Sequence, residues 1–297
     1  MIKLSFYHSL IFFNLTIILS ALEYLRSNNL LIFCLFLILS IGISHGSLDH
    51  IKGKKLLKIF KIKSINIFYF SYIAIGLVTI FIWYLFPKLL LLLFLIIAAF
   101  HFGKEDSEFI NKKKNFELIY FFKGSLIIVA PLIFHKNETM LIFEILNFDI
   151  SGNFFINDII LYFFILFSFV STLILSLNNS FDSKSLLLMD FLSIIILNYF
   201  LSPILAFTIY FCFLHSIRHS ISLIFEIDNN IWTGLPVFLK KALPLTIITI
   251  FIYLFSIYFL NTYNDFNETV YKVIFIGLAS LTFPHILLEY LLEKNGK

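Results

Sequence analysis

Ten apolar runs of nearly membrane-spanning length dominate the sequence and limit the folds it can adopt. A helix needs about 20 mostly apolar residues to cross the hydrocarbon core of a bilayer. Inside that core, only helices and closed barrels satisfy every backbone hydrogen bond. The runs lie near 8–25, 30–50, 66–86, 88–103, 117–135, 157–177, 186–201, 203–225, 243–260 and 270–292. Because several are short for a span, the sequence predicts an all-α, polytopic membrane helical bundle with about 8–10 transmembrane helices.

The composition favours one membrane-embedded domain over residues 1–297. The chain is 60% hydrophobic and 13% charged, whereas a soluble domain is about 25% charged. The net charge of +4 does not indicate nucleic-acid binding, because the lysines lie in loops between the runs. Cys34 and Cys212 both lie in apolar runs, which argues against a disulfide framework or a cysteine-based zinc site. The first run lacks a small-residue cleavage site, so we expect a retained helix rather than a signal peptide.

The distribution of charge predicts the orientation in the membrane. Loops 51–65 and 104–116 are rich in lysine, and Lys240 and Lys241 lie just before the ninth run. Loops 136–156 and 261–269 are acidic. Since cytoplasmic loops carry an excess of lysine and arginine, we expect a multi-pass protein of the inner or plasma membrane with both termini in the cytoplasm.

Histidines gather at one depth of this predicted topology. Six of the eight fall near the cytoplasmic face, namely His45, His50, His101, His215, His219 and His285. His135 maps to the outer side, and His8 suits an interfacial role. His215 and His219 are four residues apart, so they share one helix face and can bind one metal. Such residues at membrane depth indicate a functional site, although two helix-packing histidines are an alternative.

The residue types around these histidines favour a metal site. Imidazole suits iron, copper and zinc, and four nitrogens are available from three helices, on His45, His101, His215 and His219. Three carboxylates each follow a histidine by four residues and can accept a hydrogen bond from a ligand ring: Asp49, Glu105 and Glu289. Each can equally be a solvated helix end.

Other residues near the motifs have several possible roles. Arg218 can pair with Asp49 or Asp106, or act as an inner-leaflet anchor. Pro284 is expected to bend the last helix and turn His285 toward the bundle. His285 is then a fifth ligand, an outer-shell donor or a packing residue. Three glycines allow close helix contact: Gly42, Gly46 and Gly103.

Five motifs in order resemble one known family over roughly residues 40–290. They are His45-Gly46-x-x-Asp49-His50, His101-Phe102-Gly103-x-x-Asp106, Phe122-Lys123-Gly124 with Pro131-Leu132-Ile133-Phe134-His135, His215-Ser216-x-Arg218-His219, and Pro284-His285. This set resembles the bacterioopsin-related Brp/Blh family of β-carotene 15,15'-dioxygenases.

The resemblance implies a multi-helix membrane enzyme that uses Fe(2+) and O2 to split the central double bond of β-carotene into two retinals. It places the iron on His45, His101, His215 and His219. Residues that remain candidates for a second shell or an additional ligand are Asp49, His50, Asp106, Arg218 and His285. The expected partners are β-carotene, O2 and the lipid bilayer, with no nucleic acid.

Three other functions remain open from the sequence. A membrane di-iron hydroxylase acting on lipids or carotenoids usually needs about eight clustered histidines, and this chain has a single His-x-x-x-His. A histidine-containing transporter predicts polar residues through the full membrane depth. A carotenoid-binding scaffold without turnover is the third. The chain has no Gly-x-Gly-x-x-Gly and no Cys-x-x-Cys-His, so no nucleotide or haem signature is present.

Overall fold

The computed structural model describes residues 2–22, 30–107, 109, 116–148, 157–177 and 179–296, with every side chain among them except that of His45. No residue in these ranges belongs to a strand. The first half of the chain contains α1 (Ile2–Ala21), α3 (Leu31–Leu37), the π-helix η1 (Ile38–Gly42), the 3-10 helix η2 (Ile43–Leu48), α4 (Asp49–Ile59), α5 (Ile65–Leu85), α6 (Pro87–Glu105), α7 (Glu117–Phe134) and α8 (Lys136–Ile145). The second half contains α9 (Asp158–Ser176), α10 (Phe181–Phe200), α11 (Pro203–Ile209), the π-helix η4 (Tyr210–Ser216), α12 (Ile217–Ile227), α13 (Ile231–Leu260) and α14 (Phe266–Asn295).

These helices form a polytopic membrane bundle, as the apolar runs predicted. Within the described residues, 10 segments are long and apolar enough to cross a membrane. Each of the expected runs overlaps one of them. Two spans are composite: 31–59 joins α3, η1, η2 and α4, and 203–227 joins α11, η4 and α12.

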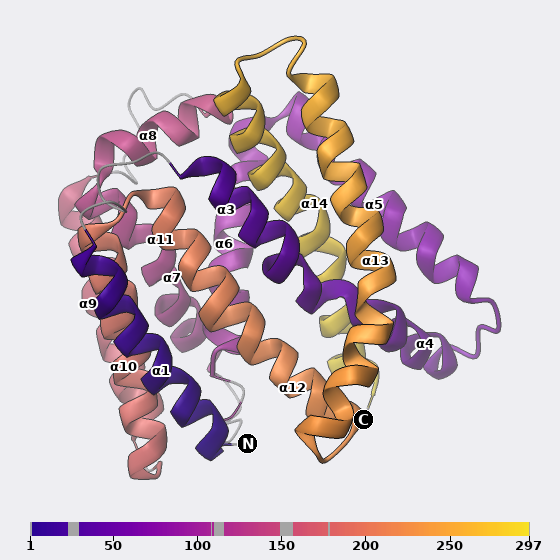
Figure 1. Ribbon diagram of the computed structural model, residues 1–297, viewed down its shortest axis with the longest axis horizontal. Coiled ribbons are helices and arrows are strands. Elements are labelled where there is room, and N and C mark those ends of the chain that lie inside the picture. The colour runs from indigo at the N-terminus through magenta and orange to yellow at the C-terminus, as the bar shows by residue number, and fades with distance from the viewer. Residues whose placement is uncertain are drawn as a thin grey trace.

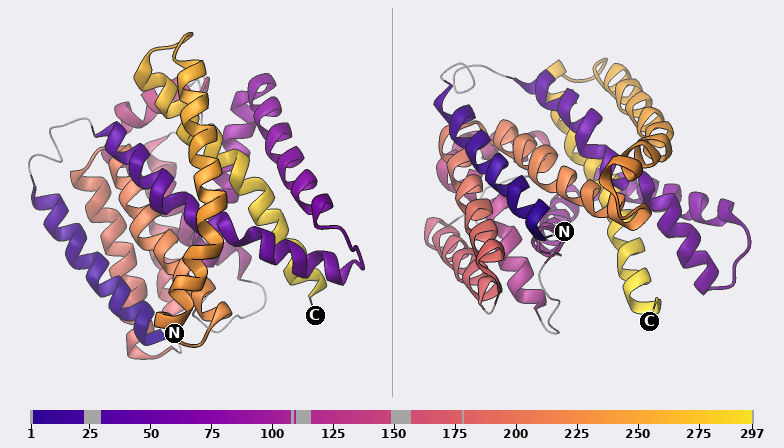
Figure 2. Two further views of the ribbon diagram at one scale, coloured as in Figure 1. Left: turned by 45° about the vertical axis from the view of Figure 1, so that its right-hand side comes forward. Right: turned by 60° about the horizontal axis from the view of Figure 1, so that its bottom comes forward.

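The two ends of the bundle carry different connections. Both termini and the start of α13 lie toward the lower edge of Figure 1. Figures 1 and 2 show α8 and the turn between α13 and α14 at the opposite end. The lysines at 112–114 and the acidic residue at 149 lie outside the described residues. The orientation across the membrane therefore stays a prediction.

Burial separates central from peripheral spans. The span Pro203–Ile227 carries two of the histidines. In its 18-residue apolar window, 72% of the residues are buried inside the bundle. By contrast, only 6% of the residues in the corresponding window of α5 are buried, and only 11% of those in α13. Since their side chains are overwhelmingly apolar, these two helices are suited to face lipid.

Two glycines bring α6 directly against α7. A Cβ atom on Gly103 would lie 1.8 Å from the carbonyl oxygen of Tyr120, and one on Gly124 would lie 1.9 Å from that of Ala99. Only glycine permits this backbone contact, as expected for helices that pack in lipid. Gly42 also makes a close contact, with the ring of Phe211. Gly46 has nothing within 4 Å of its Cβ position, so the expected packing role is wrong for this residue.

We expect Gly103→Ala to destabilise the bundle, because the added methyl group would overlap the α7 backbone. Overpacking typically costs about 1–3 kcal/mol, and here no flexible side chain can move aside. The apparent melting temperature of the purified protein in detergent should fall, while Gly46→Ala, the matched control, should leave it unchanged. Equal melting temperatures for the two variants would contradict the close α6–α7 contact.

Candidate metal centre

Four histidine side chains from three spans meet inside the bundle. The ring centroids of His101 and His215 are 5.4 Å apart, those of His101 and His285 are 5.3 Å apart, and those of His219 and His285 are 5.9 Å apart. All four residues are buried. They come from α6, η4, α12 and α14, so segments up to 184 residues apart in the chain converge on one place.

Three of these rings are held by carboxylates. Each Nδ1–H donates to an acid from a different span: His215 to Asp106 (3.0 Å), His219 to Glu105 (2.8 Å) and His285 to Asp49 (2.9 Å). The opposite ring nitrogen, Nε2, is buried in all three. A carboxylate on Nδ1–H fixes the tautomer and leaves the Nε2 lone pair for a metal, which is the usual arrangement at histidine-ligated metals.

Two tyrosines extend these pairs. Tyr72 donates its hydroxyl hydrogen to Asp49 at 2.8 Å, and Tyr210 donates to Asp106 at 2.5 Å. Burial by itself raises the pKa of Asp106, but the nearby cationic and imidazole groups, His215 foremost, hold it well below its usual range. Asp106 is therefore an ionised acceptor for both its ring and its phenol partner.

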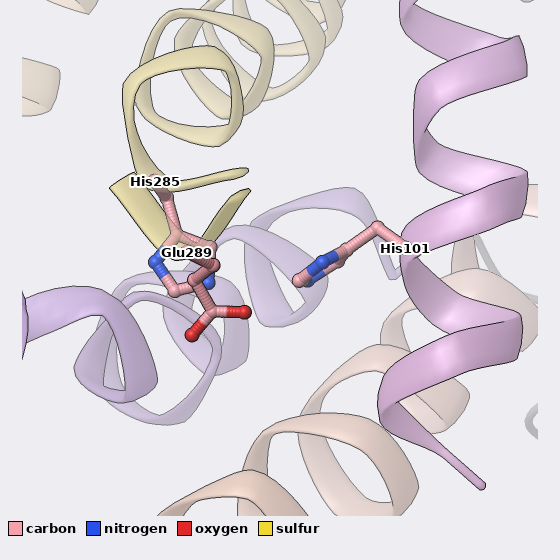
Figure 3. A group of neighbouring side chains, drawn as sticks. All are labelled: His101, His285 and Glu289. Atoms are coloured by element: carbon pink, nitrogen blue, oxygen red, sulfur yellow. The ribbon is translucent and has the colours of Figure 1, made fainter. Parts of the chain in front are cut away.

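A fourth carboxylate lies among the rings. Figure 3 shows Glu289 and His285 on α14 and His101 on α6 directed into the space between the two helices. One ligand atom from each of the three lies within 4.8 Å of the others. Glu289 also forms an ion pair with Lys52 of α4. This carboxylate can therefore contribute oxygen to the same site.

Two π-helical segments shape the surroundings of His215. Such segments add a residue to a helical turn and occur frequently at functional sites. His215 itself lies in η4, where Ser216 donates its hydroxyl to the carbonyl oxygen of Gly42, the last residue of η1, at 3.2 Å. His8 donates from Nε2 to the carbonyl oxygen of Phe213 at 2.8 Å. The expected interfacial role of His8 is therefore incomplete, because its ring anchors α1 to η4.

A cavity of about 280 Å³ adjoins the histidines. His101, His215 and His285 form part of its wall, together with residues from η1, η2, α5, α6, α11, α13 and α14. Most of the remaining wall is aromatic or aliphatic. An apolar cavity with a few converging polar groups is the usual form of a small-molecule site.

Comparison with known proteins agrees with this geometry. A family model described as β-carotene 15,15'-dioxygenase matches residues 36–293. The chain belongs to this family. A relative named β-carotene 15,15'-dioxygenase, from uncultured marine bacterium 66A03, is 29% identical over 265 residues, which cover 88% of this chain and 94% of the relative. No solved structure matches the chain. The resemblance inferred from the histidine motifs is thus confirmed.

The structure assembles most of the histidines expected for a member of this family. His101, His215 and His219 come together, and His285 joins them as a potential fourth ring. The side chain of His45 lies outside the part of the chain that the structure describes, although its backbone is in η2. His50 lines the cavity, with Nδ1 3.0 Å from the carbonyl oxygen of Ser47. His135 lies between α7 and α8, away from the clustered rings, and its expected place on the outer side stays a prediction.

The expected carboxylate pairings need correction. Spacing suggested that Glu105 would accept a hydrogen bond from His101 on its own helix, but it accepts one from His219 on another span. Asp49 accepts a hydrogen bond from His285 on α14, whereas its expected pairing with His45 involves a side chain outside the described ones and stays a prediction. A ring that points into the bundle comes closer to the facing helix than to the next turn of its own, which explains the exchange of partners.

Arg218 also has a different partner from either one expected. Its guanidinium forms two hydrogen bonds with Asp190 on α10, at 2.6 and 3.1 Å, and one with Ser9 on α1 at 2.6 Å. It meets Asp106 only through the backbone carbonyl oxygen, at 3.4 Å. Sequence reasoning missed Asp190, although a single acid inside an apolar run is a signal that could have identified it. Tyr72 and Tyr210 carried no comparable signal among the many aromatic residues.

The donor set fits a transition metal. Imidazoles with carboxylate-held Nδ1 atoms and an adjacent glutamate are ligands that iron, copper and zinc accept. The described part of the site contains no thiolate, because Cys34 and Cys212 lie in the apolar core rather than among the rings.

We expect Asp49→Asn to weaken metal binding about 10–100-fold, the usual effect of removing a carboxylate behind a histidine ligand. The substitution removes the charge that orients His285 while keeping the side-chain shape. Metal bound per chain can be measured by mass spectrometry after equilibration in metal buffers. Asp265→Asn is the control, since this exposed residue makes no capping hydrogen bond. Wild-type affinity in the Asp49 variant would show that the pair does not support a metal.

Proposed function

We propose that the protein cleaves the central 15,15' double bond of β-carotene with O2 and releases two molecules of retinal. The family supports the reaction, and one observation supports its location: four buried histidines converge inside the bundle, and His101, His215 and His285 among them line an apolar cavity. A C40 hydrocarbon dissolves in the bilayer rather than in water, so a site within the bundle suits this substrate. Both oxygen atoms enter the two aldehydes, and the reaction needs no external reductant.

The proposed cofactor is a single Fe(2+) held by histidines. His101, His215 and His219 retain the roles expected from the family, and we add His285 on the strength of its ring contacts and its bond to Asp49. His45 keeps its proposed role as a ligand from the family resemblance alone. When bound, the iron supplies the redox-active centre for O2 that side chains lack.

The protein's own residues prepare the site for this chemistry. Asp49, Glu105 and Asp106 hold three rings in one tautomer, so the metal-binding geometry is set before a metal arrives. The apolar wall excludes water from the polyene. Glu289 places a negative charge beside His101 and His285, which favours a cation at this position.

The multi-pass membrane setting is established by the ten spans, and we propose the plasma membrane with both termini in the cytoplasm. The excess of lysine in loops 51–65 and 104–116 supports this orientation. We also propose that residues 1–297 act as one membrane-embedded unit, because the histidines come from spans throughout the chain.

The test is expression in a β-carotene-accumulating bacterial host, with retinal and residual pigment measured by chromatography. We expect His215→Ala, His219→Ala and His285→Ala to reduce retinal to the level of an empty vector, because each removes a metal ligand. His135→Ala, at the other end of the bundle, should retain most of the activity.

Purified wild-type protein should hold one iron per chain. Two irons would favour a di-iron hydroxylase instead, and no retinal from the wild-type chain would refute the proposed reaction. Substantial retinal from a His285 variant with a full complement of iron would remove this residue from the ligand set.

A further inference from the structure

The cavity beside the histidines reaches the outer surface between α5 and α13. Four of its lining residues are also exposed: Tyr69 (37%) and Ile73 (60%) on α5, and Ile248 (54%) and Ile252 (58%) on α13. We call these four residues the mouth. Figures 1 and 2 show both helices on the outside of the bundle, and both are the least buried of the spans. The mouth therefore faces lipid rather than water.

Four polar side chains of the cavity donate their hydroxyl hydrogens to other groups of the protein. Thr246 and Thr249 donate to carbonyl oxygens one turn back on α13, at 3.1 and 2.9 Å. Tyr72 donates to Asp49, and Ser47 to the carbonyl oxygen of Ser44. Away from the histidines, most of the wall consists of aliphatic and aromatic side chains. Its chemistry suits a ligand without hydrogen-bonding groups.

The volume of the cavity is too small to enclose a C40 carotene. Pockets that bury drug-sized ligands measure about 300–1,000 Å³, and this one measures about 280 Å³. A stiff polyene with a ring at each end cannot fold to fit. Part of such a molecule must extend through an opening, and the mouth is an apolar opening continuous with the histidine wall.

We propose that β-carotene enters from the bilayer through the mouth and remains partly within it while its central double bond lies at the histidines. This inference rests on the proposed function for the identity of the occupant. It assigns α5 and α13 to substrate binding, although neither carries a histidine of the metal centre.

The experiment narrows the mouth from both sides. The variant Ile73→Trp/Ile248→Trp places a large ring on each rim, and Ile67→Trp/Ile247→Trp makes the same changes on the same helices. Ile67 and Ile247 are 50% and 47% exposed but do not line the cavity. Both variants and the wild type are reconstituted in nanodiscs after gel filtration has selected folded protein.

Two measurements follow. The first is retinal formation against β-carotene concentration, and the second is β-carotene retained per chain by metal-free protein, which requires no turnover. We expect the mouth variant to show at least a fivefold higher KM and a fivefold lower retention, with kcat changed less than twofold. The control variant should stay within twofold of the wild type in every measurement.

The outcomes separate this proposal from the proposed function. A mouth variant that matches the wild type in KM and retention would overturn the lateral opening, and so would equal losses in both double variants. Retention that depends on the mouth would support the opening even if the wild type formed no retinal, a result that would refute only the reaction. If the mouth variant does not fold, the single variants Ile248→Trp and Ile247→Trp provide the same comparison on neighbouring residues.

Discussion

The arrangement of the buried histidines depends on one interaction. Their rings donate hydrogen bonds to carboxylates on other spans. An ionised group at membrane depth costs several kcal/mol unless it finds a partner. Asp49, Glu105 and Asp106 each find one on a different span from their own. The same bonds that make the acids tolerable thus join α6 to the central span and the second span to α14. Stability of the bundle and orientation of the rings have one physical origin.

A second buried network of hydrogen bonds, centred on Arg218, holds the helix that carries His215 and His219. Arg218 lies between His215 and His219 in the sequence, and its bonds to Asp190 and Ser9 tie the central span to α10 and α1. Breaking a buried pair of this kind is much more costly than replacing both members by apolar residues. The network therefore limits how far the central span can rotate, and with it how far its two histidines can move. The two tyrosine–aspartate–histidine chains restrict the acids in the same way.

The architecture was largely predictable, whereas the connections inside the site were not. Span number follows from apolar length, which acts locally along the chain. The gathering of His101, His215, His219 and His285 followed from their common depth. Their partners did not, because spacing reports neighbours on one helix and Glu105 bonds to another. Asp190 shows the same limit: one acid in an apolar run signals importance but not its partner. The cavity draws its wall from many segments, and no single stretch of sequence encodes it.

The position of His285 on the tenth span has a consequence for biogenesis. Membrane helices enter the bilayer in order as the ribosome extends the chain, and Asp49, on the second span, is inserted long before its partner. Until α14 arrives, this acid lacks the ring that it holds in the finished protein. Completion of the histidine cluster is therefore one of the last events of synthesis, and a partly made chain does not yet contain all four of its rings.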